Sequence, residues 1–80
     1  MKTYLAIFEQ APDGGWGAYI PDLPGCASWG ATRDDLIRNV KEAIEGHIEA
    51  LAGDGDPVPS PTSSAELIEV DVPLASKLTL

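Results

Sequence analysis

The sequence predicts an α+β fold of the order β-β-β-α-β, in which a three-stranded antiparallel sheet is followed by one helix packed on it and then by a fourth strand. Three observations support this order. Residues 13–32 contain two turn signals that would reverse the chain. Residues 32–51 carry apolar side chains at helical spacing, and residues 66–72 alternate between apolar and mainly acidic side chains.

The first strand is predicted over residues 3–9 (TYLAIFE), where aromatic and branched side chains dominate. Residues 12–14 (PDG) then have the chemistry of a three-residue hairpin loop, because Pro fixes the first turn angle and Gly accepts a left-handed backbone. The second strand covers residues 16–20 and stops at Pro21, which lacks the N–H that a strand ladder needs. These two strands should pair as a hairpin.

A second reversal follows. Residues 23–26 (LPGC) place Pro at the second and Gly at the third position, which is typical of a type II turn. Residues 26–29 then form a short third strand. Thr32 is the expected cap of the helix, and Asp34 and Asp35 favour the positive helix start.

The helix over residues 32–51 has the clearest pattern in the chain. Its apolar stripe, which must cover the sheet, consists of Leu36, Ile37, Val40, Ile44, Ile48 and Leu51. The opposite face has the character of a solvated surface and carries Arg38, Lys41, Glu42, Glu45 and Glu49. Gly53 provides a position for the C-terminal cap.

The chain after the helix is predicted to be extended. Residues 52–64 contain three prolines at alternate positions, which favours a semi-rigid crossover back along the helix. Residues 66–72 form the fourth strand, with its three branched residues on one face. Pro73 ends this strand, and the apolar residues 74–80 either dock on a partner or fray.

Length and composition favour one small domain that associates with a second copy. We expect a single domain over residues 1–80, with a core at about 3–72 and a tail at 73–80. Its core will be thin, and the single cysteine, Cys26, excludes an intrachain disulfide. One His and one Cys fall short of a zinc site. We therefore expect a homodimer or a higher homo-oligomer.

The chain is strongly acidic, with five Lys and Arg residues against 13 Asp and Glu residues and a formal net charge of -8. This charge repels phosphate backbones, so we expect no autonomous nucleic-acid binding, and it suits a basic protein partner. The first residues lack the pattern of a secretory leader, and no apolar run reaches the ~18 residues of a membrane span. These features indicate a cytoplasmic protein without membrane association.

Few residues could carry catalysis. Cys26 and the single histidine, His47, have no spacing that predicts a dyad, so Cys26 is interpreted as a small buried hydrophobe. A hard metal ion could be held by a set of carboxylates, although turn formation and a solvated helix face explain most of them: Asp13, Asp22, Glu42 and Asp71. We assign no catalytic residue, no metal ligand and no cofactor, and expect no enzyme.

Three aromatic residues, Trp16, Tyr19 and Trp29, lie close together in the sequence. Each combines a large apolar area with a polar handle, which suits both a core edge and an interface. Because three such residues exceed what a thin core needs, we expect at least one of them at an interface.

The order of motifs resembles the HicB-like antitoxin family. The likeness covers residues 4–72 and is carried by an aromatic first strand, the block DGGWGAYIPDLPGCASWGATRDDL, the helix EAIEGHIEAL, the connection DGDPVPSP and the closing strand EVDV. The turn PDLPGC followed by G-x-T and a helix is specific in combination. The resemblance implies a fold similar to a partial ribonuclease H fold, which agrees with the order predicted above.

The resemblance also implies a function. Such a chain would be a non-enzymatic antitoxin module of a type II toxin-antitoxin system, binding and neutralising a small basic HicA-like ribonuclease toxin with a double-stranded-RNA-binding-like fold. The net charge of -8 suits that partner. Many family members continue into a C-terminal DNA-binding domain, which is not expected after Val72.

Our interpretation is a homodimeric binding module whose second strand, following turn and acidic helix face meet the toxin. The predicted partner-binding residues are Trp16, Tyr19, Asp22, Leu23, Glu42 and Glu45. One alternative is a stand-alone dimeric scaffold without a toxin. Another is a divalent-metal nuclease that uses Asp13, Asp22 and Asp71.

Overall fold

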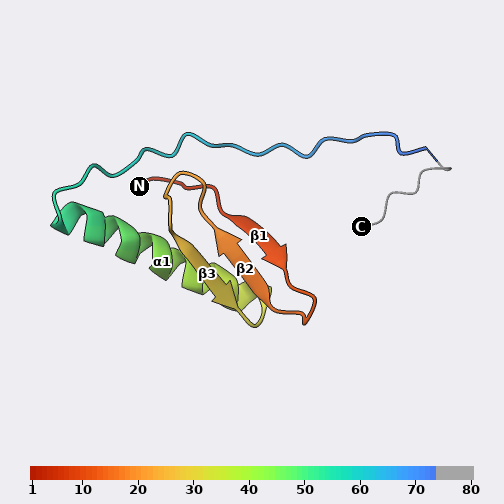
Figure 1. Ribbon diagram of the computed structural model, residues 1–80, viewed down its shortest axis with the longest axis horizontal. Coiled ribbons are helices and arrows are strands. Elements are labelled where there is room, and N and C mark those ends of the chain that lie inside the picture. The colour runs from red at the N-terminus through yellow and green to blue at the C-terminus, as the bar shows by residue number, and fades with distance from the viewer. Residues whose placement is uncertain (74–80) are drawn as a thin grey trace.

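The computed structural model describes residues 1–73. Within this range the elements are β1 (Ile7–Gln10), β2 (Trp16–Tyr19), β3 (Ala27–Gly30) and α1 (Arg33–Gly53). The strands form one antiparallel sheet in the order β1-β2-β3, and α1 lies across one face of it (Figure 1). The prediction of three antiparallel strands followed by one helix is therefore confirmed. The predicted tail at 74–80 lies outside the described residues.

Both predicted turns are formed. At the first turn, Gly14 adopts a φ of 93°, and its N–H donates to the Ala11 carbonyl at 2.9 Å. At the second, the Cys26 N–H donates to the Leu23 carbonyl at 3.0 Å, and Gly25 adopts a φ of 83°. These left-handed values are why glycine occupies both positions.

The core lies between the sheet and α1. The register pairs Phe8 with Ala18 and Ala18 with Ser28, so these three residues share the face that α1 covers. The buried side chains are Ala18, Ile20, Leu23, Cys26, Leu36 and Val40. From the predicted apolar stripe of the helix, Ile44 is half-buried and Ile37 is 50% exposed. Part of this stripe is therefore uncovered in the single chain.

The closest approach between helix and sheet is at Gly30. A Cβ atom at this position would lie 2.5 Å from the backbone nitrogen of Leu36. Only two residues separate β3 from α1, so the first turn of the helix must start directly over the end of the strand. Asn39 supports the same contact, because its Nδ2 donates to the Trp29 carbonyl at 2.8 Å.

The helix begins as predicted and ends later than predicted. The Thr32 hydroxyl accepts a hydrogen bond from the Asp35 N–H at 3.1 Å, which confirms Thr32 as the cap. Gly53 is the last helical residue, not the residue that caps the end. The left-handed position is taken by Gly55, with a φ of 75°. The next glycine along the chain thus serves the exit from the helix.

Two predicted strand segments lack a neighbouring strand and form no ladder. The sequence predicts the first strand from residue 3, whereas β1 begins at Ile7, because β2 supplies four pairing partners, the last of them Tyr19 opposite Ile7. The predicted fourth strand at 66–72 is not confirmed, since these residues are exposed and unpaired in the single chain. Pairing partners, more than side-chain preference, set the extent of the sheet.

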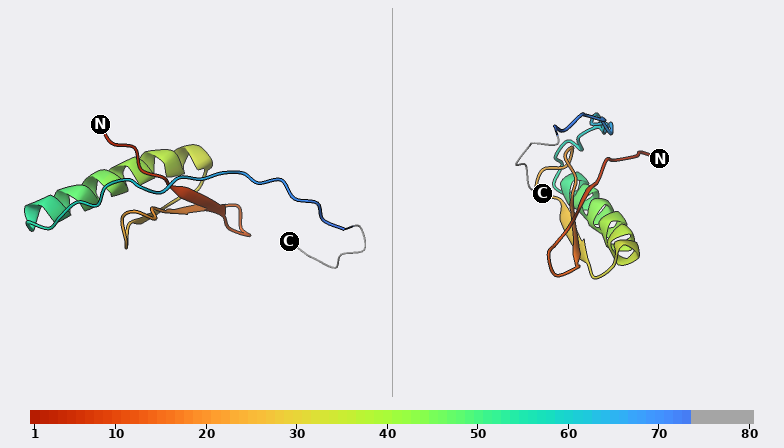
Figure 2. Two further views of the ribbon diagram at one scale, coloured as in Figure 1. Left: turned by 90° about the horizontal axis from the view of Figure 1, so that it is seen from above. Right: turned by 90° about the vertical axis from the view of Figure 1, so that its right-hand side faces the viewer.

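We call residues 54–73 the arm. It is extended, runs back past the start of β1 and continues beyond the sheet (Figures 1 and 2). One contact along this path is made by Tyr4, whose hydroxyl donates to the Pro59 carbonyl at 2.7 Å. The arm gives the chain an elongated outline of 55 × 27 × 20 Å.

Candidate functional site

The face of the sheet opposite α1 is uncovered. Cross-strand pairs place Ile7, Tyr19 and Ala27 on this face, and Gly17 with Trp29 beside them. Tyr19 is 45% exposed and Trp29 is 61% exposed. We call the surface formed by these five residues the open face. Two exposed aromatic side chains on a small sheet are typical of a protein-binding surface.

The aromatic side chain of Trp29 is held in place from two sides. Its indole lies against Gly15, where a Cβ atom would be 3.1 Å from the indole Nε1. Its backbone is tied to α1 through the side chain of Asn39. The Gly15 N–H is in turn fixed by the Asp13 carboxylate, to which it donates at 2.9 Å. A side chain ordered before binding loses less conformational entropy on association.

Two of the predicted partner-binding residues belong to the core side. Trp16 is half-buried and packs against the core, and the Arg33 guanidinium lies 5.6 Å from its ring centroid and 4.9 Å from that of Phe8. Leu23 is 0% exposed. In this conformation neither residue shares a surface with Tyr19, so the structure does not gather the predicted set into one patch.

Asp22 binds the arm. Its carboxylate accepts hydrogen bonds from the backbone N–H groups of Thr62 and Ser63 at 3.0 and 2.9 Å, and from their hydroxyls at 3.2 and 2.8 Å. Donation by Ser63 first and Thr62 second lowers the pKa of Asp22 below its ordinary value of 3.8. We call this set of contacts the clamp. In the single chain, the predicted role of Asp22 toward a partner competes with this intrachain role.

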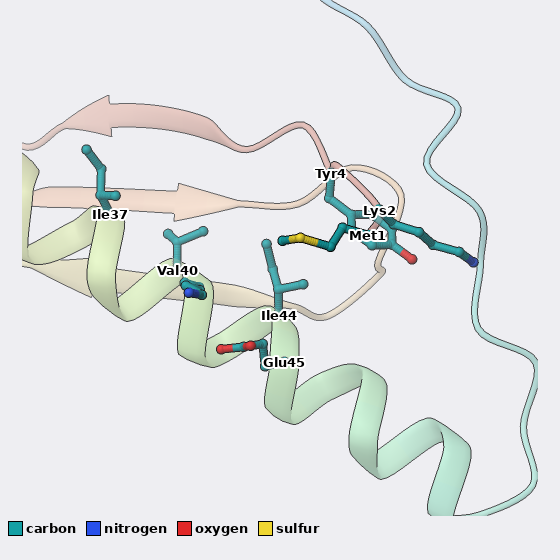
Figure 3. A pocket seen from close by; sticks show the side chains of 8 residues that line it. Met1, Lys2, Tyr4, Ile37, Val40, Ile44 and Glu45 are labelled. Atoms are coloured by element: carbon teal, nitrogen blue, oxygen red, sulfur yellow. The ribbon is translucent and has the colours of Figure 1, made fainter.

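The two remaining predicted residues, Glu42 and Glu45, lie exposed on α1. Glu45 borders a groove of about 280 Å³ between the N-terminal residues and the helix, seen in Figure 3. The groove is lined by Met1, Lys2, Tyr4, Ile37, Val40, Lys41, Ile44 and Glu45. Within the described residues no helix combines the length and the apolar character that crossing a bilayer requires.

The carboxylates of the nuclease alternative have other partners in the fold. Asp13 accepts from Gly15 inside the first turn, and Asp22 accepts from the arm. Among residues 1–73, no three His, Cys, Asp or Glu side chains gather as a metal site would require. Cys26 is buried, and this burial raises the pKa of its thiol, as expected for a small hydrophobe in a core.

Sequence reasoning left Trp29 out of the predicted set. Side chains alternate along a strand, so the odd separation between Trp16 and Tyr19 puts these two on opposite faces. Trp16 shares the parity of the apolar Ala18 and Ile20, which is the signal for the core face. Assigning Trp29 to the face of Tyr19 also needs the register between β2 and β3, where Gly17 faces Trp29.

Sequence comparisons connect this fold to known proteins. The family described as the HicB_like antitoxin of bacterial toxin-antitoxin system matches residues 4–72. The UPF0150 protein ssr1765 of Synechocystis sp. is 45% identical over 57 residues, which are 71% of this chain and 72% of that protein. Antitoxin HicB 2 of Photorhabdus laumondii is 27% identical over 78 residues, which are 96% of this chain and 55% of that antitoxin.

Two solved structures share the architecture. The N-terminal domain of the Burkholderia pseudomallei antitoxin HicB has a TM-score of 0.66 and 39% identity, covering 74% of this chain and 69% of that one. A chain in the HicA3 and HicB3 toxin-antitoxin complex has a TM-score of 0.65 and 41% identity, covering 76% of this chain and 70% of that one. With the family match over nearly its whole length, the chain belongs to the HicB-like antitoxin family.

Proposed function

We propose that this chain is a non-enzymatic antitoxin module of a type II system, which binds and neutralises a small basic HicA-like ribonuclease toxin in the cytoplasm. The observation that carries the proposal is the open face, where Tyr19 and Trp29 are exposed on a sheet surface without cover. Family membership and the likeness to a chain in a HicA3 and HicB3 complex support the choice of partner.

The open face has the properties of an interface centre. Tyr and Trp are enriched among the residues that dominate binding energy, and their truncation commonly costs about 2 kcal/mol or more. Trp29 is positioned by Gly15 and Asn39, so little order has to be gained on binding.

Electrostatics would act at longer range than these contacts. The net charge of -8 attracts a basic toxin and speeds the encounter between the two proteins. Glu42 and Glu45, exposed on α1, contribute to this field from outside the open face. Added salt should therefore slow association more than it speeds dissociation.

The test uses the full chain and the small basic protein encoded next to it. Titration calorimetry should show binding that weakens at high salt, and the wild-type chain should suppress the partner's ribonuclease activity. Trp29→Ala and Tyr19→Ala should each weaken the dissociation constant by about thirtyfold, which corresponds to about 2 kcal/mol. Ile37→Ala is the matched control, because Ile37 is a 50% exposed apolar residue on α1, outside the open face.

The outcomes separate the alternatives. Wild-type affinity in both aromatic variants would remove the open face as the toxin-binding surface. Absence of any complex at low salt would instead favour the scaffold without a toxin. Loss of binding in the Ile37→Ala control to the same degree would show that the effect is not specific to the open face.

A further inference from the structure

The end of the arm exposes a row of apolar side chains. Ile68, Val70 and Val72 are 72%, 74% and 56% exposed, and they lie on the same side of an extended chain. Leu67, on the other side, is 97% exposed. A short strand with this alternation is not stable alone in water; it needs a neighbouring strand and a surface that covers its apolar side.

The body of the molecule offers both. β1 pairs with β2 along one edge, and its other edge is free within the described residues. The groove of Figure 3 lies on the same side, between the N-terminal lead into β1 and the helix, with Ile37, Val40 and Ile44 on its floor. These helical residues span about 10 Å along α1. The three residues from Ile68 to Val72 span about 13 Å as a strand, so one row can cover the other.

Charge favours the arm as the occupant of this groove. Lys2 and Lys41 stand at its border, in a chain that has five basic residues in all. The arm carries Glu69 and Asp71 between its apolar residues, so long lysine side chains can meet opposite charges there. Glu45 is the acidic residue on the same border. A basic protein would instead meet two lysines at this groove.

The chain's own arm does not fill its own groove. The clamp at Asp22 and the contact of Tyr4 with Pro59 hold the first half of the arm near the start of β1. From there the arm leads past the sheet, and its apolar end is exposed (Figure 1). Alternate prolines stiffen the connection from residue 57 to residue 61, and a stiff connection that does not fold back favours exchange between copies.

We infer that the arm of one protomer adds residues 66–72 as a strand to the free edge of β1 in a second copy, with Ile68, Val70 and Val72 covering the groove beside it. The exchange is reciprocal, so two chains form a closed dimer with two equal arm–groove contacts. It uses residues outside the open face, so a chain that does not dimerise in this way can still bind a toxin through Tyr19 and Trp29.

The first test is the mass in solution, by sedimentation over a wide concentration range. The wild type should sediment as a dimer of twice 8.4 kDa. Ile68→Asp in the arm and Ile37→Asp in the groove should each weaken the dimer roughly a hundredfold, tenfold for each of its two contacts. Leu67→Asp is the control, because this neighbouring apolar residue lies on the opposite side of the strand. Unchanged circular dichroism should show that each variant is folded.

The second test mixes the two damaged chains. A mixed dimer of the Ile68→Asp and Ile37→Asp chains contains one contact in which both the arm and the groove are intact. Mixing should therefore restore dimers that neither variant forms alone, and native mass spectrometry with one isotope-labelled chain identifies them. A monomeric wild type, a dimer that resists both substitutions, or a mixture without mixed dimers would each overturn the inference.

Discussion

The body of the molecule, residues 7–53, and the arm, residues 54–73, were both given clear patterns by the sequence, yet only the body folds on itself. In the body each element has its neighbour in the same chain: β1 has β2, β3 has α1. The arm has an equally regular alternation at 66–72 and finds no partner strand. The difference shows that a local pattern specifies the type of an element, whereas a neighbour decides whether the element forms.

The largest effect is expected where helix and sheet meet in the body. Gly30→Ala places a Cβ atom 2.5 Å from the backbone of Leu36, so α1 must shift and the free energy of unfolding should fall by about 2–3 kcal/mol. Gly46→Ala is the matched control: nothing lies within 4 Å of its Cβ position, and the substitution should stabilise the helix by up to about 1 kcal/mol. Urea denaturation at one fixed protein concentration measures both, and equal stability of the two variants would contradict close packing of α1 on β3.

A smaller effect is expected from one substitution made in each region. Thr32→Ala removes the hydroxyl that accepts from the Asp35 N–H and should lower the free energy of unfolding by about 1 kcal/mol. Thr62→Ala removes a hydroxyl that donates to Asp22 in the arm and should leave the thermal midpoint of the body unchanged. If Thr62→Ala lowered that midpoint as much as Thr32→Ala, the arm would be part of the cooperative unit of the body.

The smallest effect concerns the clamp and its response to pH. Hydrogen bonds from Ser63 and Thr62 lower the pKa of Asp22 below 3.8, so the ionised carboxylate stabilises the clamp above that value. The clamp should persist through mildly acidic solution and open as the pH falls through the lowered pKa. The amide chemical shifts of Thr62 and Ser63 would follow this opening, with the amide of Ala18 in β2 as the internal control.

Asp22→Asn sharpens the same comparison at neutral pH. The amide side chain keeps a single acceptor oxygen, so it cannot accept all the hydrogen bonds that the carboxylate accepts. Faster amide exchange at Thr62 and Ser63 is expected, with exchange in β2 unchanged. Arm amides that exchange as slowly in this variant as in the wild type would show that Tyr4 and the prolines hold the arm without the clamp.

Local signals predicted most of the body. The two turns depend on Gly14 and Gly25 in left-handed conformations, and the helix start depends on Thr32. Each of these is decided within a few residues and is readable from the sequence. The start of β1 was not readable, because it depends on how many partners β2 offers before Pro21. The helix end was misplaced because Gly53 and Gly55 both suit a cap, and propensity does not choose between them.

The candidate site was less predictable than the fold. The aromatic content indicated an interface, and Tyr19 lies on the open face as an exposed residue. Trp16 and Leu23 carry side chains equally suited to binding, yet both pack on the core side. Which aromatic residue is exposed depends on strand register, and Trp29 reaches the open face only through its pairing with Gly17. Register is a long-range property, so the residue pattern alone leaves it undetermined.

The placement of the two tryptophans on opposite faces gives the molecule a pair of intrinsic optical reporters. Trp16, half-buried and beside Arg33, emits from the side that unfolding would flood with water. Trp29, 61% exposed, emits from the side that a bound protein would dry. Unfolding therefore shifts the fluorescence of one indole to longer wavelength, while complex formation shifts that of the other to shorter wavelength. The same chain can thus report its own folding and its own occupancy without an added dye.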